Sequence, residues 1–216
     1  DPLPIFIAMQ AAVAKLPAGV KMHVVMCGQV RHPYARKVFE EGAARLMPDV
    51  GFLLLDGAKP ETPQQALSGG DVYLFMIDNI QEAFGLAPVE GMAAGLPVLA
   101  SDWDGLKDTV SAEAGLRVKS RLLGPEYMAN ESLRMQSGVD NFVQYSAAVS
   151  AMTELDMGDM TAKIVALASN PDLRARLGQG ALARAHSTYD WSVVIPQMQA
   201  LWGEQAARKA AASAKA

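Results

Sequence analysis

Residues 72–101 read VYLFMIDNIQEAFGLAPVEGMAAGLPVLAS. An apolar run typical of a strand, residues 72–77, opens this stretch, and a second apolar run, residues 97–100, closes it. Between them, residues 86–94 carry small and apolar side chains at the spacing of a helix. Strands that are apolar throughout and alternate with helices are typical of a parallel sheet covered on both faces. The stretch therefore predicts an α/β fold.

The same alternation extends in both directions from this stretch. Toward the N-terminus the pattern predicts helices over 2–16, 33–47 and 63–67 and strands over 22–27 and 51–55; toward the C-terminus it predicts a short helix over 105–110 and a strand over 115–118. We interpret residues 1–118 as a Rossmann-like core with a mostly parallel sheet flanked by helices. Ligands of such sheets bind outside the carboxyl ends of the strands. The loops after residues 27, 55, 77 and 100 are therefore the first places to look for a site.

The character of the sequence changes after residue 118. Residues 119–155 give few signals apart from a helix within 141–152, and this length favours an insertion or a lid over an ordinary connection. Residues 156–208 predict C-terminal helices of the same domain, over 159–168, 171–188 and 191–208. The Ala-rich residues 209–216 are expected to form a frayed tail.

Composition excludes several classes of protein. Of the 216 residues, 50% are hydrophobic and 19% are charged, which indicates a globular fold and argues against disorder. The net charge of −4, without a basic run, gives no footprint for nucleic acid. The longest uncharged stretch, Asn141–Thr153, is too short to span a bilayer. Cys27 is the sole cysteine, which suits a reducing compartment, and we expect a cytoplasmic protein.

Metal chemistry and secretion are not expected from the sequence either. The three histidines, together with Cys27, lack the spacing of metal ligands, so no metal site is predicted. The chain begins at Asp1, without Met and without the pattern of a signal peptide. We therefore expect the sequence to begin within a longer protein.

Two acidic residues flank the predicted start of the helix over 86–94. Glu82 lies in the loop that leaves a strand, and Glu90 lies in the helix. Gly85 has no Cβ to keep a ligand from the backbone, and the first amides of the helix, with the positive end of its dipole, favour an anion. Carboxylates beside a phosphate site suit neutral hydroxyls, as a vicinal diol presents them. The arrangement favours a sugar phosphate or nucleotide sugar as ligand.

Residues 82–98 fit the pattern Glu-x7-Glu, with Phe-Gly-Leu inside it and Met-Ala-x-Gly-x-Pro-Val after it. This pattern resembles the donor-binding signature of retaining glycosyltransferases of the GT-B fold, of the group 1 (family 4-like) type. Residues 171–178 and the Tyr-Asp-Trp at 189–191 are similar, more weakly, to the C-terminal helices of that family. The resemblance covers most of the chain except residues 121–155. It implies the C-terminal, donor-binding half of a GT-B enzyme, with extra C-terminal helices.

The resemblance also implies roles for the matching residues. Glu90 would bind the ribose hydroxyls of the donor, and Glu82 would contact the donor sugar near the reacting carbon. Glu82 is thus the candidate catalytic residue, although not as a nucleophile, because the family transfers its sugar through positioning and stabilisation of the leaving group. Phe84, Gly85 and Leu86 complete this part of the substrate-binding set, with the Gly85 and Leu86 amides on the sugar or the diphosphate.

Two loops on neighbouring strands complete the implied donor site. Ala58 and Lys59 would lie against the base, and Gly28 ends a strand where the chain passes close to the nucleotide. The donor itself is a substrate, so no cofactor is implied.

The sequence departs from the family pattern at the diphosphate. The family has an Arg and a Lys near its first strand, and nothing in residues 1–16 matches that pair. The implied first strand would precede Asp1 and would be a central strand of the sheet. The implied partner is a missing N-terminal acceptor domain, through which alone membrane association would arise. We expect the chain by itself to be inactive.

Other interpretations remain open at this stage. One is an epimerase of the same fold that acts on nucleotide-linked sugars. Another is a non-catalytic interaction module, whose surface would be residues 119–155 and the apolar stripe from Trp191 to Trp202. Among further polar residues at strand ends, the sequence leaves open whether each contacts a ligand or has a local role: Arg31, His32, Asp78, Asn79, Asp102 and Asp104.

Overall fold

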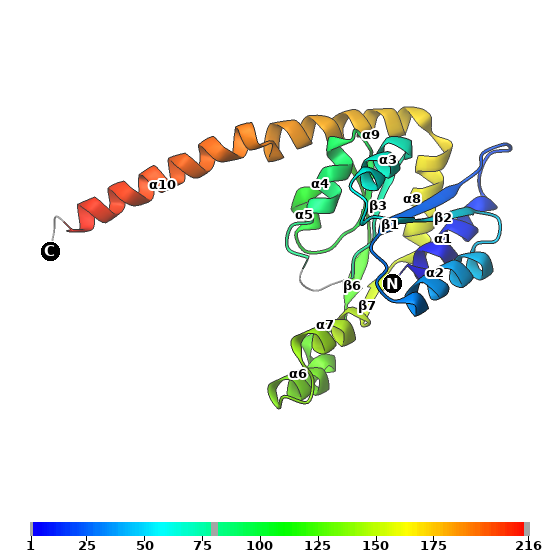
Figure 1. Ribbon diagram of the computed structural model, residues 1–216, viewed down its shortest axis with the longest axis horizontal. Helices are drawn as coiled ribbons and strands as arrows, with labels where there is room; N and C mark the ends of the chain where they lie inside the picture. The colour runs from blue at the N-terminus through cyan, green and yellow to red at the C-terminus, as the bar shows by residue number, and fades with distance from the viewer. Residues whose placement is uncertain (1, 79–81, 214–216) are drawn as a thin grey trace.

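The structure is a computed structural model that describes residues 2–78 and 82–213 (Figure 1). Helices and strands alternate up to residue 118, as the sequence predicts. The helices of this part are α1 (Leu3–Val13), α2 (Pro33–Leu46), α3 (Glu61–Gly69), α4 (Leu86–Ala93) and α5 (Leu106–Thr109). Its strands are β1 (His23–Gly28), β2 (Gly51–Asp56), β3 (Tyr73–Phe75), β4 (Val98–Ser101) and β5 (Gly115–Val118). The predicted Rossmann-like α/β class is confirmed.

The strands of this part pair only in parallel among the described residues. β1 pairs with β2 along its whole length, and β4 lies between β3 and β5, with Val98 opposite both Tyr73 and Gly115. Within residues 2–78 and 82–213, no ladder joins β1 to β3, so the strands form one sheet of two and one of three. This division falls where the resemblance places a further central strand.

Residues 119–155 form an antiparallel ribbon that carries a helical hairpin. β6 (Ser120–Leu122) pairs with β7 (Thr153–Leu155), with Arg121 opposite Glu154. Between the two strands lie the 3-10 helix η1 (Pro125–Met128), α6 (Ala129–Gln136) and α7 (Phe142–Ser150), and the hairpin points away from the body (Figure 1). The sequence predicts a helix where α7 lies. It gives no signal for β6 and β7, because each strand is only three residues long.

Helices make up the rest of the chain: α8 (Met157–Ser169), α9 (Pro171–Arg184), the π-helical turn η2 (Ala185–Tyr189) and α10 (Trp191–Ser213). Side-chain caps explain where two of them begin. The carboxylate of Asp156 accepts a hydrogen bond from the Asp159 N–H, and Asn170 accepts one from the Leu173 N–H at 2.9 Å. The predicted helix over 171–188 is thus an α-helix followed by a π-helical turn.

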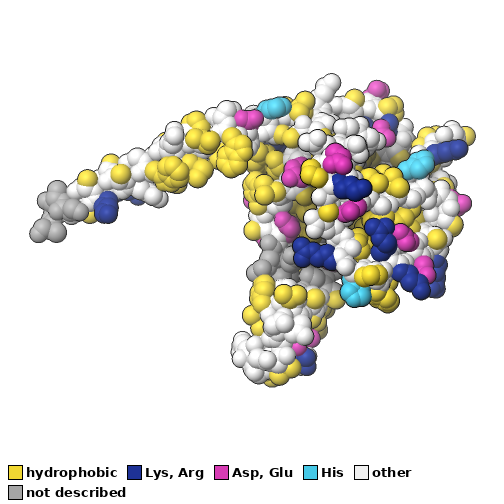
Figure 2. All heavy atoms as spheres, viewed as in Figure 1, with side chains coloured by type: hydrophobic (Ala, Val, Ile, Leu, Met, Phe, Trp, Pro, Cys, Tyr) yellow, Lys and Arg dark blue, Asp and Glu magenta, His cyan; other side chains and the backbone are white. Residues whose placement is uncertain are grey.

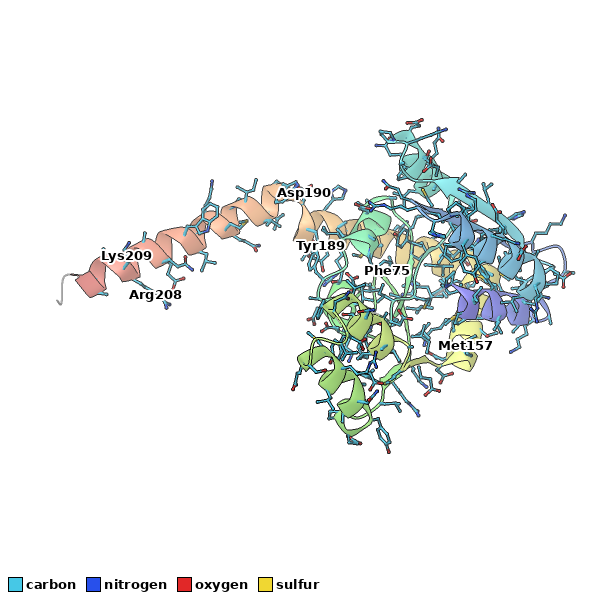
Figure 3. All side chains as sticks on the ribbon, turned by 60° about the horizontal axis from the view of Figure 1, so that its bottom comes forward. Phe75, Met157, Tyr189, Asp190, Arg208 and Lys209 are labelled. Atoms are coloured by element: carbon cyan, nitrogen blue, oxygen red, sulfur yellow. The ribbon has the colours of Figure 1, made fainter. Side chains whose placement is uncertain are left out.

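The last helix leaves the body of the molecule. Figure 3 shows Tyr189 and Asp190 where α10 leaves the body, and Arg208 and Lys209 near its far end. The prediction of a frayed tail from residue 209 is wrong for residues 209–213, since α10 continues to Ser213. Alanine, which dominates this end, is the strongest helix former. None of the described helices is long and apolar enough to cross a membrane.

The first half of α10 exposes large apolar side chains, which Figure 2 shows along the helix where it leaves the body. These exposed residues are Trp191, Ile195, Met198, Leu201 and Trp202. They belong to the stripe that the sequence predicts at helical spacing. No other described element packs over them closely enough to bury them.

One apolar cluster underlies both sheets. Val24 of β1 and Leu99 of β4 belong to the same group of buried side chains, and Phe6 of α1 and Met160 of α8 complete the contact between them. The opposite face of the three-stranded sheet packs on a second cluster, whose buried members include Met92, Val98, Ala100, Leu106 and Ala181. The two sheets therefore share a core even though no ladder of hydrogen bonds joins them in the described residues.

Substitution of Leu99 tests this shared core. Leu99 is 0% exposed, and Leu99→Ala is expected to lower the free energy of unfolding by about 2–5 kcal/mol, because the cavity adds to the lost burial. Leu201→Ala, the same change at a side chain that is 51% exposed, should cost less than about 0.5 kcal/mol. Denaturant titration of both variants measures the difference, and equal losses would contradict the assignment.

Candidate functional site

The loop between β3 and α4 carries the first group of predicted site residues. Residues 79–81, and with them Asn79, lie outside the described residues. Glu82 is partly buried, and Phe84 is 44% exposed. Gly85 is buried with φ +78°, in the left-handed region, and forms the N-cap of α4. The chain therefore turns sharply from the acidic loop into the helix at the residue type that this conformation favours.

The loop before α4 packs closely on the start of α5, which explains why Gly85 has no side chain. A Cβ there would lie 2.8 Å from Cδ2 of Leu106, whose side chain is fully buried beneath the loop. The backbone of the loop also approaches the residue before α5, since a Cβ on Gly105 would lie 1.8 Å from the carbonyl oxygen of Ala83. The loop therefore lies directly on the start of α5.

The start of α4 presents unused hydrogen-bond donors. No side chain caps this end, and the N–H groups of Leu86 and Ala87 have no partner among the described residues. Pro88, the third residue of the helix, has no N–H to offer. Two amides and the positive end of the helix dipole thus form a place for an anion or a hydroxyl oxygen.

Glu90 is exposed on the same helix, and its carboxylate lies near the hydroxyl of Tyr73. Burial raises the pKa of the Tyr73 hydroxyl, and the nearby Glu90 carboxylate and Cys27 thiol raise it further. The ring of Tyr73 packs on Gly91, where a Cβ would lie 2.5 Å from the ring. Tyr73 therefore packs on α4 next to Glu90, and its hydroxyl lies near both the Glu90 carboxylate and Cys27 of β1.

The second group of predicted residues lies at the ends of β1 and β2. The Gly57 N–H donates a hydrogen bond of 3.1 Å to the Gly28 carbonyl, and a Cβ on Gly57 would lie 2.9 Å from the Gly28 Cα. The Asp56 carboxylate accepts a hydrogen bond from the Ala58 N–H at 3.0 Å, which turns the loop and leaves Lys59 exposed. Gly28, Ala58 and Lys59 are thus brought together.

The structure also resolves several local roles that the sequence leaves open. His32 is the N-cap of α2, where its Nδ1 accepts a hydrogen bond from the Tyr34 N–H. Asp102 pairs with Arg117 at 2.8 Å, below the strand ends. The carbonyl of Asp78 accepts a hydrogen bond from the Thr153 hydroxyl at 3.4 Å, so β7 of the insertion reaches the loop after β3.

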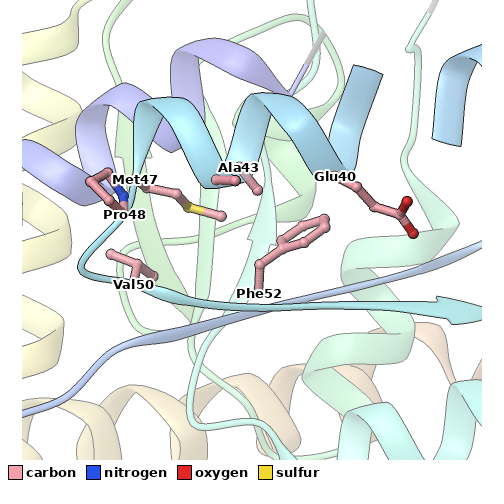
Figure 4. A pocket seen from close by; sticks show the side chains of 7 residues that line it. Glu40, Ala43, Met47, Pro48, Val50 and Phe52 are labelled. Carbon is pink, nitrogen blue, oxygen red and sulfur yellow. The ribbon is translucent and has the colours of Figure 1, made fainter. Parts of the chain in front are cut away.

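Two open surface hollows lie elsewhere on the described part of the chain. One of about 300 Å³ lies between α2 and β2 (Figure 4), lined by Glu40, Ala43, Ala44, Met47, Pro48, Val50 and Phe52. Another of about 370 Å³ lies at the base of the ribbon, lined by Lys119, Arg121, Glu154, Leu155, Asp156 and Met157. Neither includes a predicted site residue. No group of three or more His, Cys, Asp or Glu side chains within the described residues is arranged to hold a metal ion.

Sequence reasoning misses the residues that support the loop from below. The Thr109 hydroxyl donates a hydrogen bond to the Phe84 carbonyl of the loop, and Arg184 donates one to the Thr109 carbonyl. The ring of Tyr189 contacts the ring of Phe84. The first two carry no local motif, and each is more than twenty residues from Phe84 in the chain. Only the resemblance around residues 189–191 points to this region.

A family model matches this arrangement of elements. Residues 8–132, more than half of the chain, match the model described as "Glycosyl transferases group 1". The chain belongs to the group 1 glycosyl transferases. All eight predicted site residues of this group 1 domain lie inside the matched range. No curated protein matches the sequence.

Solved structures share the fold of this group 1 domain. Sucrose-phosphate synthase from Thermosynechococcus elongatus is 22% identical, with a TM-score of 0.58 over 96% of this chain and 44% of that one. TarM is 20% identical, with a TM-score of 0.54 over 90% of this chain and 31% of that one. Anabaena HepE, solved in complex with UDP, is 18% identical, with a TM-score of 0.55 over 94% of this chain and 46% of that one.

At these identities the likeness shows the fold alone, which is the Rossmann-like domain of GT-B enzymes with extra C-terminal helices. The group 1 domain spans less than half the length of each of these three proteins.

A pair of glycine variants tests the geometry of the loop before α4. Gly85→Ala and Gly95→Ala both place a side chain at positive φ, +78° and +76°, but a Cβ on Gly95 would meet nothing within 4 Å. Gly85→Ala should therefore lower the free energy of unfolding by about 1–3 kcal/mol more than Gly95→Ala, because only it collides with Leu106. Denaturant titration of both variants measures this, and equal losses would show that the loop does not lie on α5.

Proposed function

We propose that the chain is the nucleotide-sugar-binding half of a retaining glycosyltransferase, which transfers a hexose-type sugar from a nucleoside diphosphate donor to an acceptor. One observation carries the proposal. The start of α4, with two amides that have no partner in the described part of the chain, lies between Glu82 and Glu90 at the carboxyl edge of a parallel sheet. Membership of the group 1 glycosyl transferases supports the reaction class.

The start of α4 suits the leaving group of this reaction. When the bond between sugar and diphosphate breaks, negative charge develops on the diphosphate oxygen. Preorganised N–H donors stabilise that charge, and here they are the amides of Leu86 and Ala87, joined by the helix dipole. A bulky side chain at Gly85 would block the approach of the phosphate to this backbone.

The two carboxylates suit the hydroxyl groups of the donor. Glu90 would accept hydrogen bonds from the ribose, and Tyr73, whose pKa its carboxylate raises, is also near Cys27 at the end of β1. Glu82 would accept hydrogen bonds from the sugar near the reacting carbon and orient it for transfer. The proposal assigns the base to the backbone around Ala58 and Lys59.

The rest of the enzyme would supply what this domain lacks. The chain spans less than half of the structures that share its fold, and we propose that the acceptor binds to an N-terminal domain of the same protein. We propose that this other part of the protein also brings the cations for the diphosphate. The donor then binds between the two halves, which agrees with the absence of predicted site residues from the linings of the two surface hollows.

Calorimetric titration with UDP-, GDP- and ADP-glucose tests donor binding. We expect weak binding of one of these, and Glu90→Gln should weaken it by about tenfold or more, because a hydrogen bond to a charged acceptor is lost. Glu41→Gln is the matched control: Glu41 pairs with Lys37 on the surface of α2 and should have no effect. Equal affinities of wild type and Glu90→Gln would contradict the assignment of Glu90.

Product analysis separates transfer from epimerisation. The chain alone, supplied with the donor that it binds, should release neither a transferred sugar nor an epimer of the donor, since the proposed acceptor side is on another domain. Chromatography of the nucleotide-sugar pool and mass spectrometry of added acceptors measure both products. Transfer by the 216-residue chain would contradict the proposed division of labour, and an altered donor would favour an epimerase.

A further inference from the structure

The loop before α4 is held by two elements that are far from it in the sequence. α5 lies directly under the loop, and η2 packs against α4 from the side. Three side chains make the specific contacts: Thr109 from the end of α5, Arg184 from the end of α9, and Tyr189 from the end of η2. None of them is among the residues that the sequence predicts for the site.

Thr109 provides the hydrogen bond closest to the donor loop. Its side chain is buried, with 2% of the residue exposed. The hydroxyl oxygen lies 2.6 Å from the carbonyl oxygen of Phe84 and 2.9 Å from that of Gly105. The hydroxyl has a single proton to donate, and the shorter contact is the one to Phe84. Thr109 therefore ties the backbone immediately before Gly85 to the end of α5.

Arg184 holds Thr109 in turn. Its Nε donates a hydrogen bond of 2.9 Å to the Thr109 carbonyl, and its Nη2 donates to the Asp108 carbonyl. These two bonds occupy the last two carbonyls of the short helix α5, and the Tyr189 hydroxyl also donates to the Thr109 carbonyl at 3.5 Å. The guanidinium thus fixes the end of α5 on which Thr109 stands.

Tyr189 contacts both the loop and Arg184. Its ring meets that of Phe84 edge to face, with the centroids 5.6 Å apart. The Arg184 guanidinium lies 5.6 Å from the centroid of the same ring, and its Nη2 lies 3.2 Å from the Tyr189 hydroxyl. Phe84 is thus held twice, at its carbonyl by Thr109 and at its ring by Tyr189, and Arg184 contacts both.

We propose that Thr109, Arg184 and Tyr189 are positioning residues for the donor loop. They act through Phe84, set the left-handed turn at Gly85, and so aim the amides at the start of α4, without contact to the ligand. The proposal rests on the proposed function, because it takes this loop to be the part that binds the sugar and the diphosphate.

A purely structural role predicts a different outcome. Thr161 on α8 is the matched comparison: it is also buried, and its hydroxyl donates a 2.7 Å hydrogen bond to the Met157 carbonyl, but it lies on the other side of the sheet from the loop. Thr109→Val and Thr161→Val remove the same group from two buried sites. Both should lower the melting temperature, and only Thr109→Val should affect the loop.

Hydrogen exchange measured by mass spectrometry tests the loop without any ligand. In the peptide that spans residues 82–93, Thr109→Val should speed exchange by about fivefold or more, while Thr109→Ser, which keeps the hydroxyl, should stay within about twofold of wild type. Thr161→Val should leave this peptide unchanged. Wild-type exchange of this peptide in Thr109→Val, or equal acceleration in Thr161→Val, would overturn the proposal.

Titration with UDP-glucose and UDP, or with the matching GDP or ADP pair, gives the functional readout. Thr109→Val should weaken binding of the nucleotide sugar by about fivefold or more, and Thr109→Ser should restore it. Should Thr109→Val fail to fold, Tyr189→Leu against Tyr189→Phe repeats the comparison, since only leucine removes the ring that meets Phe84. Failure of wild type to bind any of these nucleotides counts against the proposed function, while wild-type binding that all variants share counts against the positioning role.

Discussion

The alignment of the two sheets depends on a shared apolar core, because no backbone ladder joins them in the described residues. β1 and β2 form one sheet, β3 to β5 form the other, and α1 and α8 pack across both. The predicted site is divided in the same way. Gly28 ends β1 and Ala58 follows β2 of the first sheet, while Glu82 and Glu90 follow β3 of the second. The distance between these two groups of predicted residues is therefore set by side-chain packing, and the Tyr73 hydroxyl lies near both Glu90 and Cys27.

Much of the fold could be predicted because its strands are continuous apolar runs and its helices are punctuated by Gly, Pro and caps. The strands of the ribbon could not be predicted. Each has only three residues, and the charged Arg121 lies opposite the charged Glu154, so neither strand shows the alternation of apolar and polar residues that marks a strand. The extension of α10 was missed because alanine is read as low complexity although it favours helix. The break between α9 and η2 has no signal in the sequence that we recognise.

The candidate site divides along similar lines. The sequence could predict Gly85 at the turn into the helix, because glycine between a strand and a helix favours a close turn. The structure adds that a Cβ there would collide with Leu106. His32 could not be predicted, since a histidine before a proline serves equally as a cap or as a ligand until the helix is seen. Thr109 and Arg184 could not either. Their contacts join residues 25 and 75 positions apart, and only the folded chain brings them together.

The divided sheet has a consequence for the exchange of backbone protons. In a parallel strand, successive residues direct their N–H groups alternately to the two neighbouring strands. Within the described residues β1 is paired only with β2 and β3 only with β4, so about half of the amides in each strand lack a ladder partner. Along β1 these are the amides of His23, Val25 and Cys27, whose residues are exposed, because the backbone of Met22 and Gly28, and so of the even-numbered residues, faces β2. The exchange of these amides would report the arrival of a pairing strand more directly than any side chain of the core.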